Sequence, residues 1–237
     1  MLKRLEFQIR NLSIQYIDVS ESLIEGSIPK IPNNIVYNII GKMQMMSNKK
    51  YCSTRFVNIQ TEHYLYYFRA VQYWFKILDK QPIFEEDGVK KVTGEMKTIY
   101  CNSEKEKYVI IAFLSSSCFF LNYIIWSSCQ VVNSRDFNVF FNIENVANDV
   151  TNQIEKLGIL LQTDYQKHSQ IKIRNYSKKG REFTMSKQHF FIKKSKPIID
   201  EIDKVLAKHY GFTDEELDFI INYDIKYRMG DELNANE

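Results

Sequence analysis

A long uncharged stretch constrains the fold of this chain more than any other feature of its sequence. From Tyr108 to Ser134, 27 consecutive positions carry no charged residue, which is long enough to cross a bilayer. The stretch is only modestly apolar, because it contains Ser115, Ser116, Ser117, Asn122, Ser127, Ser128, Gln130 and Asn133. We therefore expect a long central helix from about Glu104 to Trp126, buried on most faces by a large domain, with a membrane span as the less favoured alternative.

The composition is that of a globular protein with an aromatic core. Of the 237 residues, 44% are hydrophobic and 26% charged, and 16 Phe and 15 Tyr contrast with 8 Gly and 4 Pro. Runs rich in Tyr, Phe, Val and Thr at 51–59, 63–77 and 96–102 predict strands. The sequence thus predicts an α+β fold, with mixed strands around the long central apolar helix.

The cysteines and the N-terminal residues indicate in which cellular compartment the protein is expected. Cys52, Cys101, Cys118 and Cys129 form no CxxC pair, and no His lies at metal-ligand spacing from them. Charged residues interrupt any apolar segment near the N-terminus, so nothing there resembles a secretory signal. We expect reduced thiols and a cytoplasmic protein.

Periodicity places two further elements, and turn residues place a loop. Residues 34–46 carry an apolar helical stripe after two prolines, and residues 144–158 carry a second stripe. Residues 79–94 contain Pro82, Gly88 and Gly94 and predict a loop. Residues 5–16 fit a strand or a helix equally well.

The C-terminus has the clearest helix boundaries. Ser195 can cap a helix whose first turn tolerates Pro197, and Gly211 stands where a left-handed residue would end it. Thr213 and Glu216 have the spacing of a capping box that begins a second short helix. We predict two units, a domain over 1–196 and a small helical C-terminal appendage over 197–237.

Charge is distributed unevenly along the chain. The net charge is only +3, and residues 1–164 are balanced. Residues 165–196 then hold ten basic side chains against Glu182 alone, interleaved with aromatic residues, whereas residues 197–237 are acidic. A basic, aromatic-rich segment is typical of a nucleic-acid-binding surface. The alternatives are a solvated segment that neutralises the acidic tail and a contact with an anionic membrane surface.

Missing motifs exclude several activities. No two glycines are closer than six positions, so a glycine-rich nucleotide-binding turn or a P-loop is absent, and no HExxH motif occurs. Asp79, Glu95 and Lys97 loosely fit the D…ExK arrangement of metal-dependent nucleases. This pattern is common by chance, so a small Mg²⁺-dependent nuclease is kept only as the alternative function.

The C-terminal third resembles a known family. Ser195–Asp203, Leu206–Thr213 and Glu216–Gly230 are similar to the C-terminal end of type II restriction–modification N6-adenine DNA methyltransferases, the TaqI-like and type IIG enzymes. The resemblance runs from about Ile28 to Gly230. It is also carried by earlier runs, namely Tyr66–Arg69, Tyr73–Lys76, Ala112–Tyr123 and Ser128–Phe137.

This resemblance implies a DNA target recognition domain that has no catalytic residue, cofactor or metal of its own. S-adenosylmethionine, and any Mg²⁺, would belong to a methyltransferase domain or subunit outside this sequence, and the partner would be double-stranded DNA positioned for base flipping. Expected phosphate contacts are Lys172, Arg174, Lys178, Lys179, Arg181, Lys193 and Lys194. Expected base contacts are Asn133 and Arg135, with Arg69 and Lys76 as further candidates.

Overall fold

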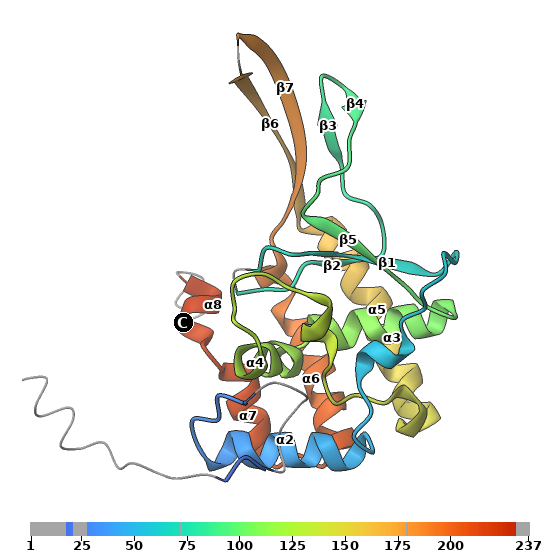
Figure 1. The fold of residues 1–237 in the computed structure, drawn as a ribbon, viewed down its shortest axis with the longest axis vertical. Coiled ribbons are helices and arrows are strands. Elements are labelled where there is room, and N and C mark those ends of the chain that lie inside the picture. Colours follow the sequence, from blue (N-terminus) through green and yellow to red (C-terminus); the bar gives the residue numbers. More distant parts are fainter. Residues whose placement is uncertain (1–17, 21–27, 72, 179, 231–237) are drawn as a thin grey trace, which may run out of the picture.

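Two short buried helices form the centre of the computed structural model, which describes residues 18–20, 28–71, 73–178 and 180–230 (Figure 1). They are α3 (Glu104–Ser115) and α4 (Ser117–Trp126). Every residue from Val109 to Tyr123 is buried. The uncharged stretch therefore forms core as far as Ser127, as its composition predicts, whereas most of residues 128–134 are exposed. The 5–16 segment lies outside the described residues.

The expected single helix over 104–126 is wrong, because the chain breaks at Ser116. Ser116 is extended, and α3 and α4 meet there at 64°. Its hydroxyl donates to the carbonyl of Phe113 at 2.6 Å and accepts from the amide of Phe119 at 3.0 Å. One serine thus satisfies the end of the first helix and the start of the second. Among the described helices, none is by itself long and apolar enough to span a membrane, although this bent pair passes by length and composition.

Helix α2 (Asn34–Met46) and helix α5 (Asn148–Lys167) cover this centre. The first matches its predicted bounds and begins at Asn33, whose side chain accepts from the amide of Val36 at 3.0 Å. The second begins later and runs nine residues further than the predicted 144–158. It crosses α3 so closely that a Cβ at Gly158 would overlap the backbone of Tyr108.

The C-terminal helices α6 (Lys196–Tyr210), α7 (Asp214–Asn222) and α8 (Ile225–Met229) follow one another in short turns. Gly211 ends α6 at φ 68°, and the capping box of Thr213 and Glu216 opens α7, both as predicted. Ser195 precedes α6 but makes no side-chain cap. It donates instead to Asp164 at 2.6 Å.

Helix α6 is a core helix and not part of a separate appendage. Ile199, Ile202, Leu206 and Tyr210 are buried in the same hydrophobic core as α3 and α4. The predicted boundary between residues 196 and 197 therefore marks the start of a helix. Residues before and after this boundary pack into one hydrophobic core.

A small antiparallel sheet lies on one side of the helices (Figure 1). Strand β1 (Tyr64–Phe68) stands between β2 (Ile77–Leu78) and β5 (Met96–Tyr100). Two of the three predicted strand runs are thus strands in part. The third, 51–59, contains the 3-10 helix η2 (Cys52–Arg55), and Tyr51 and Val57 beside it form only isolated β-bridges.

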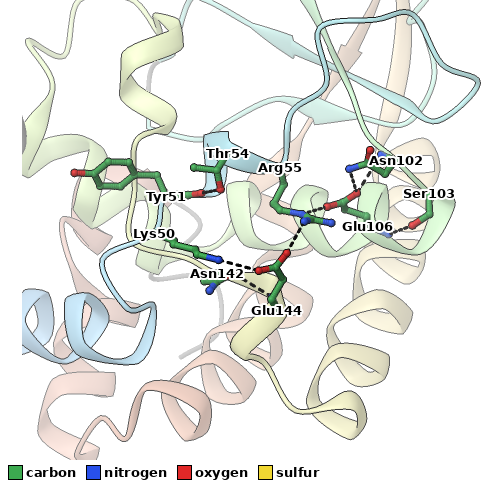
Figure 2. A network of polar contacts seen from close by, with 9 residues as sticks. All are labelled: Lys50, Tyr51, Thr54, Arg55, Asn102, Ser103, Glu106, Asn142 and Glu144. Carbon is green, nitrogen blue, oxygen red and sulfur yellow. Dashed lines mark hydrogen bonds and ion pairs between the residues drawn. The ribbon is translucent and has the colours of Figure 1, made fainter.

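A polar network holds η2 in place (Figure 2). Arg55 pairs with Glu106 of α3 and, at 2.8 Å, with Glu144 of the 3-10 helix η4 (Ile143–Asn145). Lys50 pairs with the same Glu144 at 2.9 Å. Because Glu106 is almost fully buried, these pairs fix η2 against the first turn of α3.

A second antiparallel sheet projects away from the helical layer (Figure 1). Its strand order is β4-β3-β7-β6. The long hairpin consists of β6 (Ser169–Lys178) and β7 (Arg181–Phe190). The short hairpin of β3 (Phe84–Glu86) and β4 (Val89–Lys90) lies within the predicted 79–94 loop and pairs with β7.

Candidate nucleic-acid interface

The hairpin β6–β7, here called the arm (residues 169–190), contains most of the basic segment predicted from charge. Its two strands are antiparallel and paired along their whole length, from Ser169 opposite Phe190 to Lys178 opposite Arg181. Helix α5 leads into it and the 3-10 helix η5 (Ile192–Ser195) leaves it, so both ends are anchored in the helical layer. The arm extends beyond that layer (Figure 1).

The register of the arm places its basic side chains on one face. Residues directly opposite each other in an antiparallel pair lie on the same face, and successive residues alternate between faces. The pairs Lys172–Lys187, Arg174–Met185, Tyr176–Phe183 and Lys178–Arg181 therefore share one face. We call Lys172, Arg174, Lys178, Arg181 and Lys187 the basic face.

The opposite face of the arm differs in character. It carries Ile171 and Ile173, which are 53% and 66% exposed, with small polar residues and Glu182. Neither described strand of the arm contributes a lysine or arginine to this face. The separation of charge between the two faces is thus complete over the described length of the arm.

Two cross-strand pairs on the basic face bring like charges together. Lys172 stands opposite Lys187, and Lys178 stands opposite Arg181. Like charges directly opposite each other destabilise a sheet. At the Lys178–Arg181 pair, Glu86 and Asp87 already reduce this repulsion, since each lies 3.1 Å from Arg181. At the Lys172–Lys187 pair a bound anion would relieve it, so this pair favours an anionic partner.

Aromatic rings separate the charges along the basic face. Tyr176 and Phe183 stack with centroids 5.6 Å apart. The Lys187 ammonium lies 5.2 Å from the ring centroid of Phe84 and 6.0 Å from that of Tyr176. These rings support the long aliphatic stems of the cations and hold their charged ends outward.

The basic face continues to the body of the protein through His189 and Lys76. Burial lowers the pKa of His189, and four surrounding cations, Lys172, Lys76, Arg174 and Lys187, lower it further. Residues from the arm and from the turn before β2 thus place positive charge around the same imidazole. Lys76 itself lies over the ring of Phe68, and burial lowers its pKa.

Among the predicted phosphate contacts, Arg181 has carboxylate partners and Lys179 cannot be placed. Arg181 pairs with Glu86 and with Asp87, each at 3.1 Å, and Asp87 also accepts from the amide of Thr184 at 2.8 Å. Arg181 therefore fastens the β3–β4 hairpin to the tip of the arm, and its charge is largely compensated. Lys179 lies outside the described residues. Lys172, Arg174, Lys178 and Lys187 have no carboxylate partner among the residues that the structure describes.

Lys193 and Lys194 lie at the base of the arm in η5. The Lys193 ammonium approaches the carbonyl of Met229 at 3.5 Å. Lys194 and Lys172 both lie over the ring of Phe191, at 5.8 and 5.7 Å from its centroid. These predicted phosphate contacts therefore extend the positive surface of the arm toward the helical layer.

The predicted base contacts Arg69, Asn133 and Arg135 come from two segments that the fold brings together. The amide of Val132 donates to the carbonyl of Arg69 at 2.8 Å. The Asn133 amide donates to the carboxylate of Asp136 at 2.7 Å, which opens the 3-10 helix η3 (Ser134–Phe137). This contact uses only the main chain of Asn133, whose side-chain amide donates to the carbonyl of Val131 at 3.3 Å. Asn133 and Arg135 are both exposed.

The structure does not bring the predicted nuclease residues together. Asp79 follows β2 and Glu95 precedes β5, and these strands lie on opposite sides of β1, about 10 Å apart. Asp79 instead accepts from the hydroxyl of Tyr108 at 3.3 Å. The described residues contain no group of three or more His, Cys, Asp or Glu side chains able to hold a metal.

Lys187 and His189 are site residues that the sequence reasoning missed. The signal was present, because Lys172, Arg174, Tyr176 and Lys178 recur at every second position of one run. That period predicts one face of a strand. The residues opposite them become identifiable only when the turn that sets the register is known.

Comparisons with models of protein families, with curated proteins and with solved structures find no match for this chain.

Proposed function

We propose that this chain is a duplex-DNA-binding module that lays the basic face of its arm against the nucleic acid. The observation that carries the proposal is the concentration of Lys172, Arg174, Lys178 and Lys187 on one face without carboxylate partners in the described residues. A polyanion with closely spaced phosphates is the partner that relieves the repulsion between these like charges.

The shape of the arm supports a duplex as the polyanion. The major groove of DNA admits a two-stranded β-ribbon, and the arm is such a ribbon only between its pairing with β3 at residues 185–187 and its tip, where Lys178 lies. Lysine and arginine side chains on the basic face would contact phosphates and fix the register. Asn133 and Arg135 are the leading candidates for reading base edges, with Arg69, on the segment joined to theirs at Val132, as a further candidate.

The biological setting that we propose rests on the resemblance of the C-terminal runs. In this setting the chain is the target recognition module of an N6-adenine DNA methyltransferase of the restriction–modification type. It would hold DNA for base flipping by a methyltransferase domain or subunit that binds S-adenosylmethionine. The geometry of the arm supports the DNA-binding part of this proposal.

The salt dependence of DNA binding tests the proposal. Fluorescence anisotropy of a labelled mixed-sequence duplex should give an affinity that falls steeply with salt. The expected log–log slope is about −4, near −0.9 for each of the four basic-face residues that lack a carboxylate partner. A flat response, or no binding at low salt, would remove the arm from any interface with DNA.

A further inference from the structure

A cavity of about 560 Å³ opens at the base of the arm. Three segments that are far apart in the sequence form its walls: Ala70, Tyr73, Trp74 and Lys76 before β2, residues 189–193 from the end of the arm and the start of η5, and residues 227–230 from α8 and its C-cap. Its volume is in the range of sites for small organic ligands. The cavity thus lies where the basic face meets the helical layer.

The charged groups that line the cavity are all basic. Lys76, Lys193 and Arg228 contribute cations and His189 contributes an imidazole, while no carboxylate is among the described lining residues. Lys193 spans part of the cavity wall, since its ammonium lies near the carbonyl of Met229. This one-sided charge selects for an anionic ligand.

Arg228 is a buried cation in the wall of the cavity. Its side chain is almost fully buried, at 3% exposure, and its guanidinium lies 4.2 Å from the ring centroid of Trp74, another residue of the cavity wall. One nitrogen, Nη2, donates to the hydroxyl of Ser117 at 3.1 Å. The Nε and Nη1 donors are buried without an acceptor. Buried guanidinium donors are normally satisfied. Both nitrogens are closed off from the cavity, so an oxyanion reaches them only after the Arg228 side chain turns, and the nearby charge of Asp203 already balances part of this cation.

The rim of the cavity presents aromatic faces. Tyr73 and Tyr227 lie 6.3 Å apart with their rings nearly parallel, at 16°, and they are 42% and 63% exposed. Exposed rings at the mouth of a cationic cavity are a stacking platform for a planar heterocycle. The ligand should therefore combine an aromatic base with an anionic group.

We propose that this cavity binds one nucleoside phosphate, with the phosphate toward Lys76, Lys193 and Arg228 and the base against Tyr73 and Tyr227. The source is a free nucleotide or an unpaired nucleotide of bound DNA. Binding of an unpaired nucleotide of DNA rests on the proposed function, whereas binding of a free nucleotide does not.

Titration of the full chain with deoxyadenosine 5′-monophosphate tests the cavity alone. Calorimetry should show saturable binding, and deoxyadenosine without its phosphate should bind at least about tenfold more weakly. Tyr227→Ala should weaken nucleotide binding about tenfold by removing a stacking face, and Lys193→Gln should weaken it through the phosphate. Tyr64→Ala, which removes a partly exposed tyrosine on β1, is the matched control and should leave binding unchanged.

Two results would overturn the proposal. One is the absence of saturable nucleotide binding up to about 10 mM, a concentration that corresponds to negligible affinity. The other is equal binding by Tyr227→Ala and Tyr64→Ala in proteins with the same circular dichroism spectrum.

A second experiment identifies the source and separates this proposal from the proposed function. If the nucleotide comes from DNA, a duplex with one unpaired 5′-phosphorylated nucleotide should bind more tightly than a blunt duplex, and Tyr227→Ala should abolish only that difference. If the source is a free nucleotide, the two duplexes should bind equally.

Reversing the charges of Lys172 and Arg174 should weaken duplex binding and leave mononucleotide binding within about twofold, because both side chains lie outside the cavity wall. Nucleotide binding without duplex binding would therefore contradict only the proposed function.

Discussion

Asp203 is a carboxylate buried at the break between the two central helices. It is 1% exposed, and it accepts from the amides of Ser117 and Cys118 at 3.1 and 3.0 Å, at the start of α4. Burial raises its pKa to about 6, although these hydrogen bonds and the charge of Arg228 act in the opposite direction. Loss of solvation thus outweighs the favourable position at a helix N-terminus.

The raised pKa of Asp203 predicts a pH dependence of stability. Because the folded state holds this proton more tightly than the unfolded chain, the contribution to stability is lost as pH rises through about 6 and is complete below about 4. Urea denaturation should show that acidification from pH 7 to pH 4 raises the stability of the wild type relative to Asp203→Asn. The expected change is on the order of 2–3 kcal/mol. If the stability difference between the wild type and Asp203→Asn stays constant, or changes in favour of the variant on acidification, the raised pKa of Asp203 is contradicted.

Arg135 and Lys178 should behave differently when each is replaced by alanine. The exposed Arg135 is a candidate for base reading, so Arg135→Ala should relax the preference at one base pair by about tenfold. Lys178→Ala, which removes a cation from the basic face, should weaken binding to all DNA sequences about equally. Selection from a randomised duplex library measures both effects. An unchanged site preference in Arg135→Ala would mean that it does not read bases.

At the level of elements, the close crossing of α3 and α5 depends on Gly158. A Cβ at this position would overlap the Tyr108 carbonyl oxygen, so the helices would have to separate. Gly158→Ala should lower the free energy of unfolding by about 1–3 kcal/mol despite the better helix propensity of alanine. Gly41→Ala is the matched control, because Gly41 lies in α2 with nothing within 4 Å of an added Cβ. It should raise the free energy of unfolding by up to about 1 kcal/mol, and destabilisation of equal size at both positions would contradict this account.

The elements that the sequence predicts well are those whose ends are set by local contacts. Helix α2 matches its predicted bounds because the Asn33 cap and the apolar stripe are both local, and Gly211 and Thr213 mark helix ends through their own backbone and side chain. The break at Ser116 was missed because a buried serine can equally continue a helix, hydrogen-bonding back to the preceding turn. The composition of the 51–59 run predicts a strand, and the 3-10 helix found there is not foreseeable because Glu106 and Glu144, which pair with Arg55, are distant in the sequence.

For the whole molecule, the charge of residues 165–196 predicted the region of the candidate site but not its geometry. The arm, its basic face and the cavity at its base depend on pairing between distant segments. The pairing of β3 with β7 brings Glu86 to Arg181, and this contact changes Arg181 from an expected phosphate ligand into a structural residue. Local periodicity carries no information about such contacts, whereas the alternation of basic residues in β6 was readable in advance.

Charge reversal on the arm tests the central claim most directly. The triple variant Lys172→Glu, Arg174→Glu and Lys178→Glu is compared with a control that carries the same change in net charge. The control reverses three exposed lysines outside the arm, namely Lys49, Lys156 and Lys208.

Duplex affinity is measured by anisotropy at one ionic strength for both proteins. We expect the arm variant to lose on the order of 100-fold in affinity and the control to stay within about threefold of the wild type. Equal losses in the two variants would mean that only overall charge matters, and the assignment of the basic face as the DNA-binding surface would then be wrong.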